Sequence, residues 1–204
     1  VGISPMLDRS MRWLEAVLLE SIVGIASRLP LETASAVGGR IGAELGSRTR
    51  KHRHVIDNLR IVFPDADRAW IERTALGVWE QIGRVAGEYP HLPSFLDSDR
   101  VELVVEFDLE RLRRSPRGYV FVAMHQANWN LFSLGGHLGG FPLAVVNRRQ
   151  INPRIEALVA QFRDKMPCEI LDVTTVPRKM VEALTKGRSV GLFVGGRSEV
   201  EFGA

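Results

Sequence analysis

Apolar residues recur at intervals of three and four in the N-terminal part of the chain, which is the spacing of one face of an α-helix. The clearest case is the segment 13–30, where Leu14, Leu18, Ile22 and Ile25 follow this interval. Charged residues interrupt the segment, whereas a membrane-spanning helix needs about 20 predominantly apolar residues. The pattern therefore predicts either an interfacial helix in the headgroup region of a membrane or a buried helix of a globular protein.

Further helices are predicted up to about residue 92. A glycine-rich stretch at 36–46 would allow close contact between helices, and the apolar positions of 54–63 end at a proline. Asp65 or Asp67 can cap the next helix, because a short side-chain oxygen accepts a hydrogen bond from a free N–H of the first turn. The apolar stripe of that helix consists of Trp70, Leu76, Trp79, Ile82 and Val85.

The pattern changes after residue 92, where short apolar runs rich in β-branched residues alternate with helical patterns. The runs predict strands at 119–124, 143–147, 169–171 and 190–194. The helical patterns lie between them at 128–138, 153–165 and 176–186. Strands that alternate with helices favour a mostly parallel sheet flanked by helices. We therefore predict an α/β fold, with a helical, membrane-associating region at 1–92 and an α/β core at 93–204 in one structural unit.

Composition and charge refine this prediction. With 45% apolar and 25% charged residues among 204, the chain has the composition of a folded globular protein. The net charge is only +3, but basic residues cluster at 48–53, 111–117 and 148–149. Such clusters suit anionic lipid headgroups or nucleic acid, although each can also be a solvated face. The single cysteine, Cys168, permits no intrachain disulfide, which fits a reducing compartment such as the cytosol.

The segment 124–130 (MHQANWN) contains the residue best suited to catalysis. His125 falls where a predicted strand ends and a helix begins, and ligands of open α/β sheets bind beyond the carboxyl ends of the strands. A histidine there can act as a general base toward a hydroxyl group. Such a base needs a partner, normally a carboxylate, that orients it and stabilises the imidazolium. An isolated histidine is more often structural than catalytic. The location of His125 at a strand-to-helix turn is what favours a catalytic role.

Two other kinds of site are rejected. The segment 187–191 fits Gly-x-Ser-x-Gly, but the nucleophile elbow of α/β-hydrolases needs a strand before the serine and a helix after it. Here a predicted helix precedes Ser189, a strand follows it, and no histidine lies beyond it. No spacing of His, Cys and acidic residues indicates a metal site, and no cofactor is predicted.

Several segments resemble, in the same order, conserved blocks of the lipid A lauroyl/myristoyl acyltransferase family of the lysophospholipid acyltransferase superfamily. His125 and the Asn-Trp pair that follows it resemble the family's His-x4-Asp/Glu motif. The other matching segments are NLRIVFP at 58–64, VWEQIGR at 78–84, EYPHL at 88–92, VVNRR at 145–149 followed by Asn-Pro, and EVEFG at 199–203. The resemblance therefore covers nearly the whole chain.

The resemblance implies an enzyme that moves a fatty acyl chain from an acyl carrier protein thioester to a hydroxyl of a lipid A precursor. It implies His125 as the general base, Arg148 as an anion contact and Glu199 as a further substrate contact. Asn130 stands where the family has the orienting Asp or Glu, and would be an inadequate orienting partner in the catalytic site. Its amide can accept a hydrogen bond from the imidazole but supplies no negative charge. The family also implies the cytoplasmic face of the bacterial inner membrane, peripheral or single-anchor, and a longer C-terminal part than this chain has.

Three alternatives stay open. Asn130 is compatible with a catalytically impaired or inactive relative that binds lipid, and the chain could be a fragment, a diverged homologue or a decayed copy. The acceptor could be a phosphatidylinositol mannoside, which actinobacterial relatives use. A nucleic-acid-binding module built on the basic cluster at 48–54 is disfavoured, because the cluster lacks aromatic side chains for base stacking and adjoins an apolar helical segment.

Overall fold

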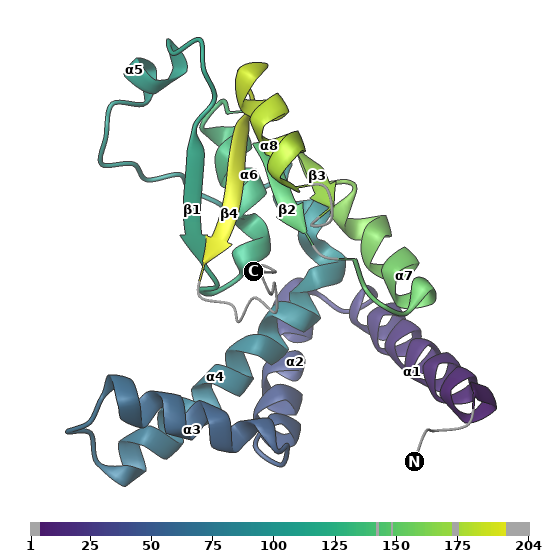
Figure 1. Cartoon of the computed structure of the whole chain (residues 1–204). Helices are drawn as coiled ribbons and strands as arrows, with labels where there is room; N and C mark the ends of the chain where they lie inside the picture. Colours follow the sequence, from purple (N-terminus) through teal and green to yellow (C-terminus); the bar gives the residue numbers. More distant parts are fainter. Residues whose placement is uncertain (1–4, 142, 148, 173–175, 195–204) are drawn as a thin grey trace, which may run out of the picture. The chain divides into compact units, whose positions relative to one another are not determined.

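The computed structural model describes residues 5–141, 143–147, 149–172 and 176–194. The chain divides into two compact units, Val1–His91 and Leu92–Ala204, called here the N-terminal and the C-terminal unit. The first consists of helices, and the second contains a parallel four-stranded sheet with helices against it (Figure 1). The predicted α/β class is confirmed.

Four helices form the N-terminal unit. Their bounds are Pro5–Ala26 for α1, Leu31–Gly46 for α2, Lys51–Val62 for α3 and Arg68–Glu88 for α4. Of the two aspartates considered as a cap for α4, Asp67 takes that position, and its carboxylate accepts a hydrogen bond from the Trp70 N–H at 2.7 Å. A 3₁₀ helix, η1 (Tyr89–Phe95), follows α4.

Helices α2 and α4 pack closely because small residues face one another. A Cβ added at Gly83 would lie 2.1 Å from the carbonyl oxygen of Gly38, and one added at Gly42 would lie 2.4 Å from that of Trp79. Only residues without a side chain allow backbones to approach this closely. The glycine-rich stretch of the sequence therefore functions as a helix contact.

One face of α1 is exposed. Leu14, Leu18, Ile22 and Ile25 are each more than half exposed, and they lie at the helical spacing expected from the sequence. Among the residues that the structure describes, no helix combines the length and the apolar content needed to cross a bilayer.

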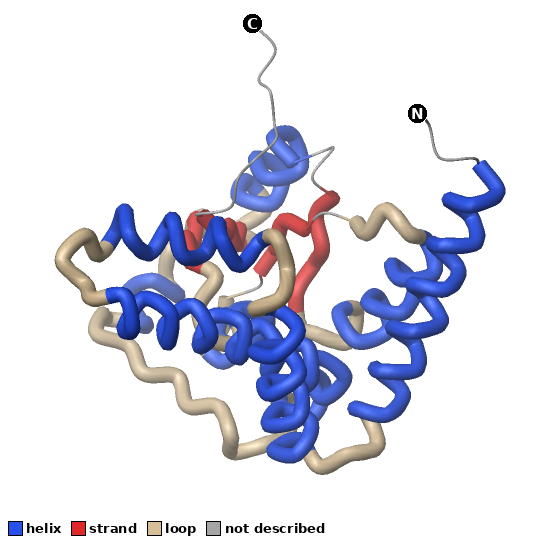
Figure 2. Tube along the Cα trace, turned by 90° about the horizontal axis from the view of Figure 1, so that it is seen from below, coloured by secondary structure: helices blue, strands red, loops and turns tan. Residues whose placement is uncertain are grey.

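The C-terminal unit is built on four parallel strands in the order β1-β4-β2-β3. Their bounds are Val120–Met124 for β1, Leu143–Asn147 for β2, Cys168–Asp172 for β3 and Ser189–Val194 for β4. The helices of this unit are α5 (Leu109–Arg113), η2 (Trp129–Leu131), α6 (Phe132–Leu138), α7 (Pro153–Arg163) and α8 (Val176–Thr185). Figure 2 shows the strands in red, next to one another. Because all strands are parallel, their carboxyl ends share one edge.

The alternation of side chains along β4 gives the sheet two different faces. Val190 belongs to a buried cluster with Ala144 of β2, Leu171 of β3 and Ala183 of α8. Gly191 belongs to the opposite face, where a Cβ would lie only 2.4 Å from the ring of Phe132 on α6. Thus α8 packs on one face of the sheet and α6 on the other.

Candidate active site

His125 lies directly after β1, at the edge where the strands end. The chain turns there: the Gln126 N–H donates a hydrogen bond to the Met124 carbonyl at 2.9 Å, and Ala127 has a φ of 43°. Such a left-handed conformation is uncommon outside glycine and often marks a functional turn. The turn leads into η2 and α6 and leaves His125 exposed. The expected location at a strand-to-helix junction is therefore what the structure shows.

The rings of Trp129 and Phe193 contact the His125 imidazole. The imidazole centroid lies 5.4 Å from the Trp129 ring centroid, in an edge arrangement. It lies 4.8 Å from the Phe193 ring centroid, and the imidazole and Phe193 ring planes are inclined at 36°. Phe193 in turn contacts Phe132 at 5.2 Å. No described residue forms a hydrogen bond with either nitrogen of the imidazole. The aromatic contacts restrict the orientation of the ring and leave its nitrogens accessible to a substrate.

The side chain of Asn130 is directed toward Asn128. Its Nδ2 donates to Asn128 Oδ1 at 3.1 Å, and the same oxygen accepts from the Asn130 N–H at 3.2 Å. The structure describes both His125 and Asn130 and shows no hydrogen bond between them. An ionised carboxylate at position 130 would be an acceptor only and could not bond Asn128 Oδ1 in this way. The amide thus has a local partner that a carboxylate would lack.

Arg148 and Glu199 lie outside the described residues, but the segment that follows Arg148 is well held. Arg149 Nε forms an ion pair with Asp172 Oδ2 at 3.0 Å, which joins the ends of β2 and β3. The Gln150 N–H donates to Glu156 Oε2 at 2.8 Å. The carboxyl edge of the sheet therefore carries a basic side chain that is fixed by a carboxylate.

Glu156 also forms an ion pair with Arg163, whose Nη2 lies 3.0 Å from Glu156 Oε1, and both side chains are less than one-fifth exposed. Burial acts to raise the pKa of Glu156. The hydrogen bonds from Gln150 and Arg163 and the positive charge nearby outweigh it, so that the pKa is lowered. The carboxylate is therefore ionised and fixed in the folded chain.

Neither a metal cluster nor a reactive thiol emerges from the described residues. Within those ranges no three His, Cys, Asp or Glu side chains come together as metal ligands. Burial raises the pKa of the Cys168 thiol, and a hydrogen bond with Ser133 only partly offsets this effect. A raised pKa lowers the thiolate fraction, which is the nucleophilic form.

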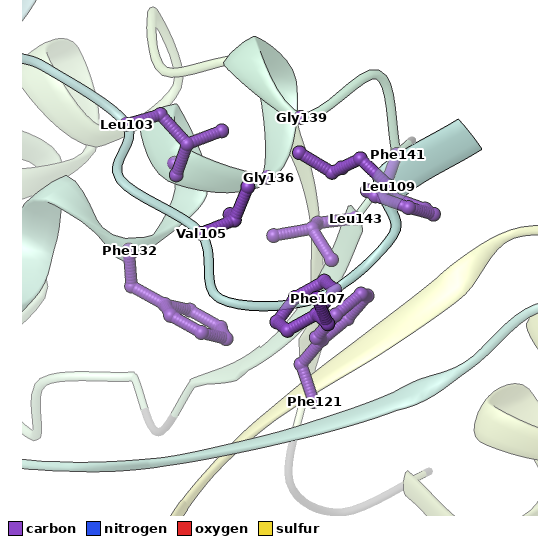
Figure 3. A pocket seen from close by; sticks show the side chains of 11 residues that line it. Leu103, Val105, Phe107, Leu109, Phe121, Phe132, Gly136, Gly139, Phe141 and Leu143 are labelled. Atoms are coloured by element: carbon purple, nitrogen blue, oxygen red, sulfur yellow. The ribbon is translucent and has the colours of Figure 1, made fainter. Parts of the chain in front are cut away.

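An apolar pocket lies on the α6 face of the sheet, where sequence analysis predicted no site. It encloses about 290 Å³ and is lined almost entirely by carbon. In Figure 3, side chains from the loop before α5, from β1, from α6 and from β2 point toward this common space. The lining residues are Leu103, Val105, Phe107, Leu109, Phe121, Phe132, Gly135, Gly136, Gly139, Phe141 and Leu143.

The pocket and His125 are linked by aromatic side chains. Phe132 lines the pocket and contacts Phe193, which contacts the imidazole. The sequence signal for this pocket was weak, because its lining comes from segments with no common periodicity. The glycine pair Gly135-Gly136 in α6 is the one hint, since glycine on a helix next to a strand leaves space for a ligand or a neighbour.

The C-terminal unit is thus an α/β domain with an exposed histidine at the carboxyl edge of a parallel sheet, connected to an apolar pocket through the rings of Phe193 and Phe132. Comparison with protein families gives a match to the model of bacterial lipid A biosynthesis acyltransferases over residues 4–198. The chain belongs to this family, whose activity is acyl transfer in lipid A biosynthesis. Comparisons with curated proteins and with solved structures gave no match.

Proposed function

We propose that this chain transfers a fatty acyl chain from an acyl carrier protein thioester to a hydroxyl of a lipid A precursor, with His125 as the general base. The observation that carries the proposal is the environment of His125: it is exposed at the end of β1, and no described residue engages its ring nitrogens. Family membership supplies the reaction class.

The proposed reaction has two proton transfers. His125 takes the proton of the acceptor hydroxyl while the hydroxyl oxygen attacks the thioester carbonyl carbon. The carbon–oxygen bond forms, the carbon–sulfur bond breaks, and the sulfur of the carrier leaves with the proton held by the imidazolium. By resemblance, Arg148 would contact an anionic group of a substrate and Glu199 would contact the acceptor.

The apolar pocket is proposed to hold the acyl chain. Its lining exposes almost no polar surface, so a methylene chain would replace water at about 0.8 kcal/mol per buried CH₂. A charged or sugar-like ligand would lose its hydrogen bonds to water there without replacement. Through Phe132 and Phe193, the pocket adjoins the imidazole that would act on the carbonyl end of the chain.

The exposed apolar face of α1 supports membrane association of residues 1–92. An amphipathic helix binds the interface with its apolar face toward the acyl chains. Leu14, Leu18, Ile22 and Ile25 supply such a face. We therefore propose that the enzyme works at the cytoplasmic face of the bacterial inner membrane, where a lipid acceptor and a soluble carrier protein can meet.

A second candidate function is an impaired or inactive relative that binds lipid. The observation that favours it is the hydrogen bond from Asn130 Nδ2 to Asn128 Oδ1, which leaves the imidazole without an orienting partner among the described residues. Loss of the equivalent carboxylate in serine proteases lowers turnover about 10⁴-fold. Such a relative would still bind an acyl chain in the pocket and associate with the membrane, but its rate of acyl transfer would be low or zero.

The experiment that separates the two candidates measures acyl transfer from labelled acyl carrier protein to a lipid A precursor, with a phosphatidylinositol mannoside as the alternative acceptor. We expect Asn130→Asp to raise the rate by up to about 10⁴-fold and His125→Ala to abolish it. His137→Ala provides a control, because it removes a different exposed imidazole, one that is not among the residues lining the pocket. Equal inactivity of the natural chain, Asn130→Asp and His125→Ala, all folded and lipid-bound, would instead indicate a fragment or a lipid-binding relative and contradict the catalytic assignment.

A second experiment tests the pocket. Gly135 lines it, and a Cβ there meets no atom within 4 Å, so Gly135→Leu places a side chain in open space rather than against the backbone. Displacing two methylenes of an acyl chain costs about 1.6 kcal/mol, or about 15-fold in rate. We expect Gly135→Leu to lower transfer of dodecanoyl chains by that factor relative to butanoyl chains, with Gly135→Ala as the control. An unchanged chain-length preference would contradict the assignment.

A further inference from the structure

A basic cleft lies on the N-terminal unit between the end of α2, the length of α3 and the start of α4. It encloses about 640 Å³ and is open to solvent. Four arginines and two carboxylates are among its lining residues, so its formal charge is +2 with histidine neutral. The charged side chains are Arg50, Arg53, Arg60, Arg68, Asp57 and Glu72.

The positive charges of the cleft are only partly neutralised. Arg68 is paired with Glu72 at 2.9 Å, whereas Arg53 lies 4.0 Å from Asp57, at the outer limit of an ion pair. Arg50 and Arg60 form no ion pair with any residue in the described part of the chain. Several guanidinium groups around one cleft repel one another, and an anion bound among them would relieve this repulsion.

His52 adds a neutral donor to the cleft. Its Nδ1 accepts a hydrogen bond from Trp79 Nε1 at 3.0 Å, so the proton of the neutral ring is on Nε2. The indole thereby fixes the tautomer, and Nε2–H remains available because no described residue bonds it. A phosphate group accepts hydrogen bonds from guanidinium and imidazole N–H groups alike.

An exposed apolar tip adjoins the cleft at the turn between α3 and α4. Ile61 is 78% exposed and Val62 is 66% exposed, directly after Arg60. Phe63 is 44% exposed, and its ring is held by an edge contact with Trp70 at 5.0 Å. Three consecutive large apolar residues exposed beside arginines match a lipid leaflet, which offers acyl chains next to negatively charged headgroups.

We propose that the cleft between α3 and α4 binds the phosphate group of an anionic phospholipid headgroup, while Ile61, Val62 and Phe63 enter the acyl-chain region. The inference extends the membrane association of the proposed function from a general surface to a defined headgroup site. A phosphodiester anion is the shared chemistry of lipid headgroups and free phosphates. The apolar tip decides for the lipid, because a soluble phosphate gives it nothing to contact.

The test uses the full chain and co-sedimentation with vesicles of phosphatidylglycerol and phosphatidylcholine. Removal of one basic side chain near an anionic surface weakens partitioning about fivefold, so we expect the double variant Arg50→Gln/Arg60→Gln to bind about 25-fold more weakly. Arg40→Gln/Arg73→Gln makes the same change in net charge at exposed positions outside the cleft and should bind nearly as the natural chain does. Ile61→Ser/Val62→Ser should weaken binding without altering the cleft.

Three results would overturn the inference. Equal weakening by both arginine pairs would indicate a diffuse charge effect. Calorimetric binding of inorganic phosphate that is lost in Arg50→Gln/Arg60→Gln, with vesicle binding intact, would make the cleft a site for soluble phosphates. Loss of acyl carrier protein binding instead of vesicle binding would make it a protein site. The vesicle assay needs no turnover, so it gives the same answer with His125→Ala and is independent of the proposed catalysis.

Discussion

The contact between α2 and α4 allows a sharp test, because Gly77 and Gly83 of α4 have opposite surroundings. A Cβ at Gly83 would lie 2.1 Å from the Gly38 carbonyl oxygen and 2.9 Å from the Gly42 Cα, where ordinary van der Waals contact begins at 3.4 Å. A Cβ at Gly77, in the same helix, meets nothing within 4 Å. The two substitutions to alanine therefore share their helix propensity and differ in the clash.

The expected magnitudes follow from this geometry. Alanine in place of an interior helical glycine stabilises by about 1 kcal/mol, so Gly77→Ala should raise the free energy of unfolding by about that amount. Gly83→Ala gains the same term but forces two backbones apart, and overpacking costs about 1–3 kcal/mol. The obstructing atoms belong to backbone that cannot rotate away, so the upper end applies. Gly83→Ala should then lose about 2 kcal/mol, about 3 kcal/mol below Gly77→Ala.

Urea unfolding followed by tryptophan fluorescence measures this difference. Trp79 is a suitable probe, because its indole packs so closely on Gly46 of α2 that a Cβ there would lie 2.2 Å from the ring. A separation of the helices by Gly83→Ala should also change the emission of the folded protein. If Gly83→Ala were as stable as Gly77→Ala, with the same midpoint and slope, the close approach of α2 and α4 would be refuted.

Two further predictions concern the C-terminal unit. The pKa of Glu156 is lowered, because the hydrogen bonds from Gln150 and Arg163 outweigh burial, which opposes ionisation. The carboxylate therefore contributes stability above its unfolded pKa of about 4.3, and this stability is lost as the pH falls through the folded pKa. Glu156→Gln should therefore cost about 1.5–3 kcal/mol at pH 7 and progressively less below about pH 4, and a pH-independent difference in urea unfolding would contradict this. Burial raises the pKa of Cys168 despite its hydrogen bond with Ser133. Iodoacetamide at pH 8 should therefore alkylate the folded chain several-fold more slowly than the urea-unfolded chain. Equal rates would show that the thiol is not protected.

The strands and helices were predictable where one local signal decided them. The apolar runs at 143–147 and 190–194 correspond to β2 (Leu143–Asn147) and to β4 (Ser189–Val194), since buried parallel strands need continuous β-branched residues. The cap of α4 was predictable as one of two aspartates. The order of the strands was not, because it depends on which crossovers pack, and no local pattern carries that information.

The candidate site also combines features that the sequence predicts with features that it does not. His125 was found from a strand end followed by a helix start, both of which are local signals. The apolar pocket was missed because Leu103 and Phe107 lie in a loop without periodicity and meet Phe132 and Leu143 only in the folded unit. The partner of the Asn130 amide was missed too, since either Asn128 or His125 could have bonded it. Hydrogen-bond choice within a turn depends on backbone geometry that the sequence pattern does not specify.

If His125 is the general base, as proposed, its aromatic contacts raise the question whether they replace the carboxylate that the family has at position 130. A carboxylate worth about 10⁴-fold in rate supplies about 5.4 kcal/mol at 1.36 kcal/mol per decade. A cation near an aromatic face gains about 0.5–2 kcal/mol, and the Phe193 ring lies 4.8 Å from the imidazole at 36°, close to that arrangement. Phe193 can therefore offset at most about two-fifths of the deficit on these figures. In the proposed mechanism, packing can supply the orientation of the ring, but stabilisation of its charge would still depend on position 130, which is why Asn130→Asp is the decisive substitution.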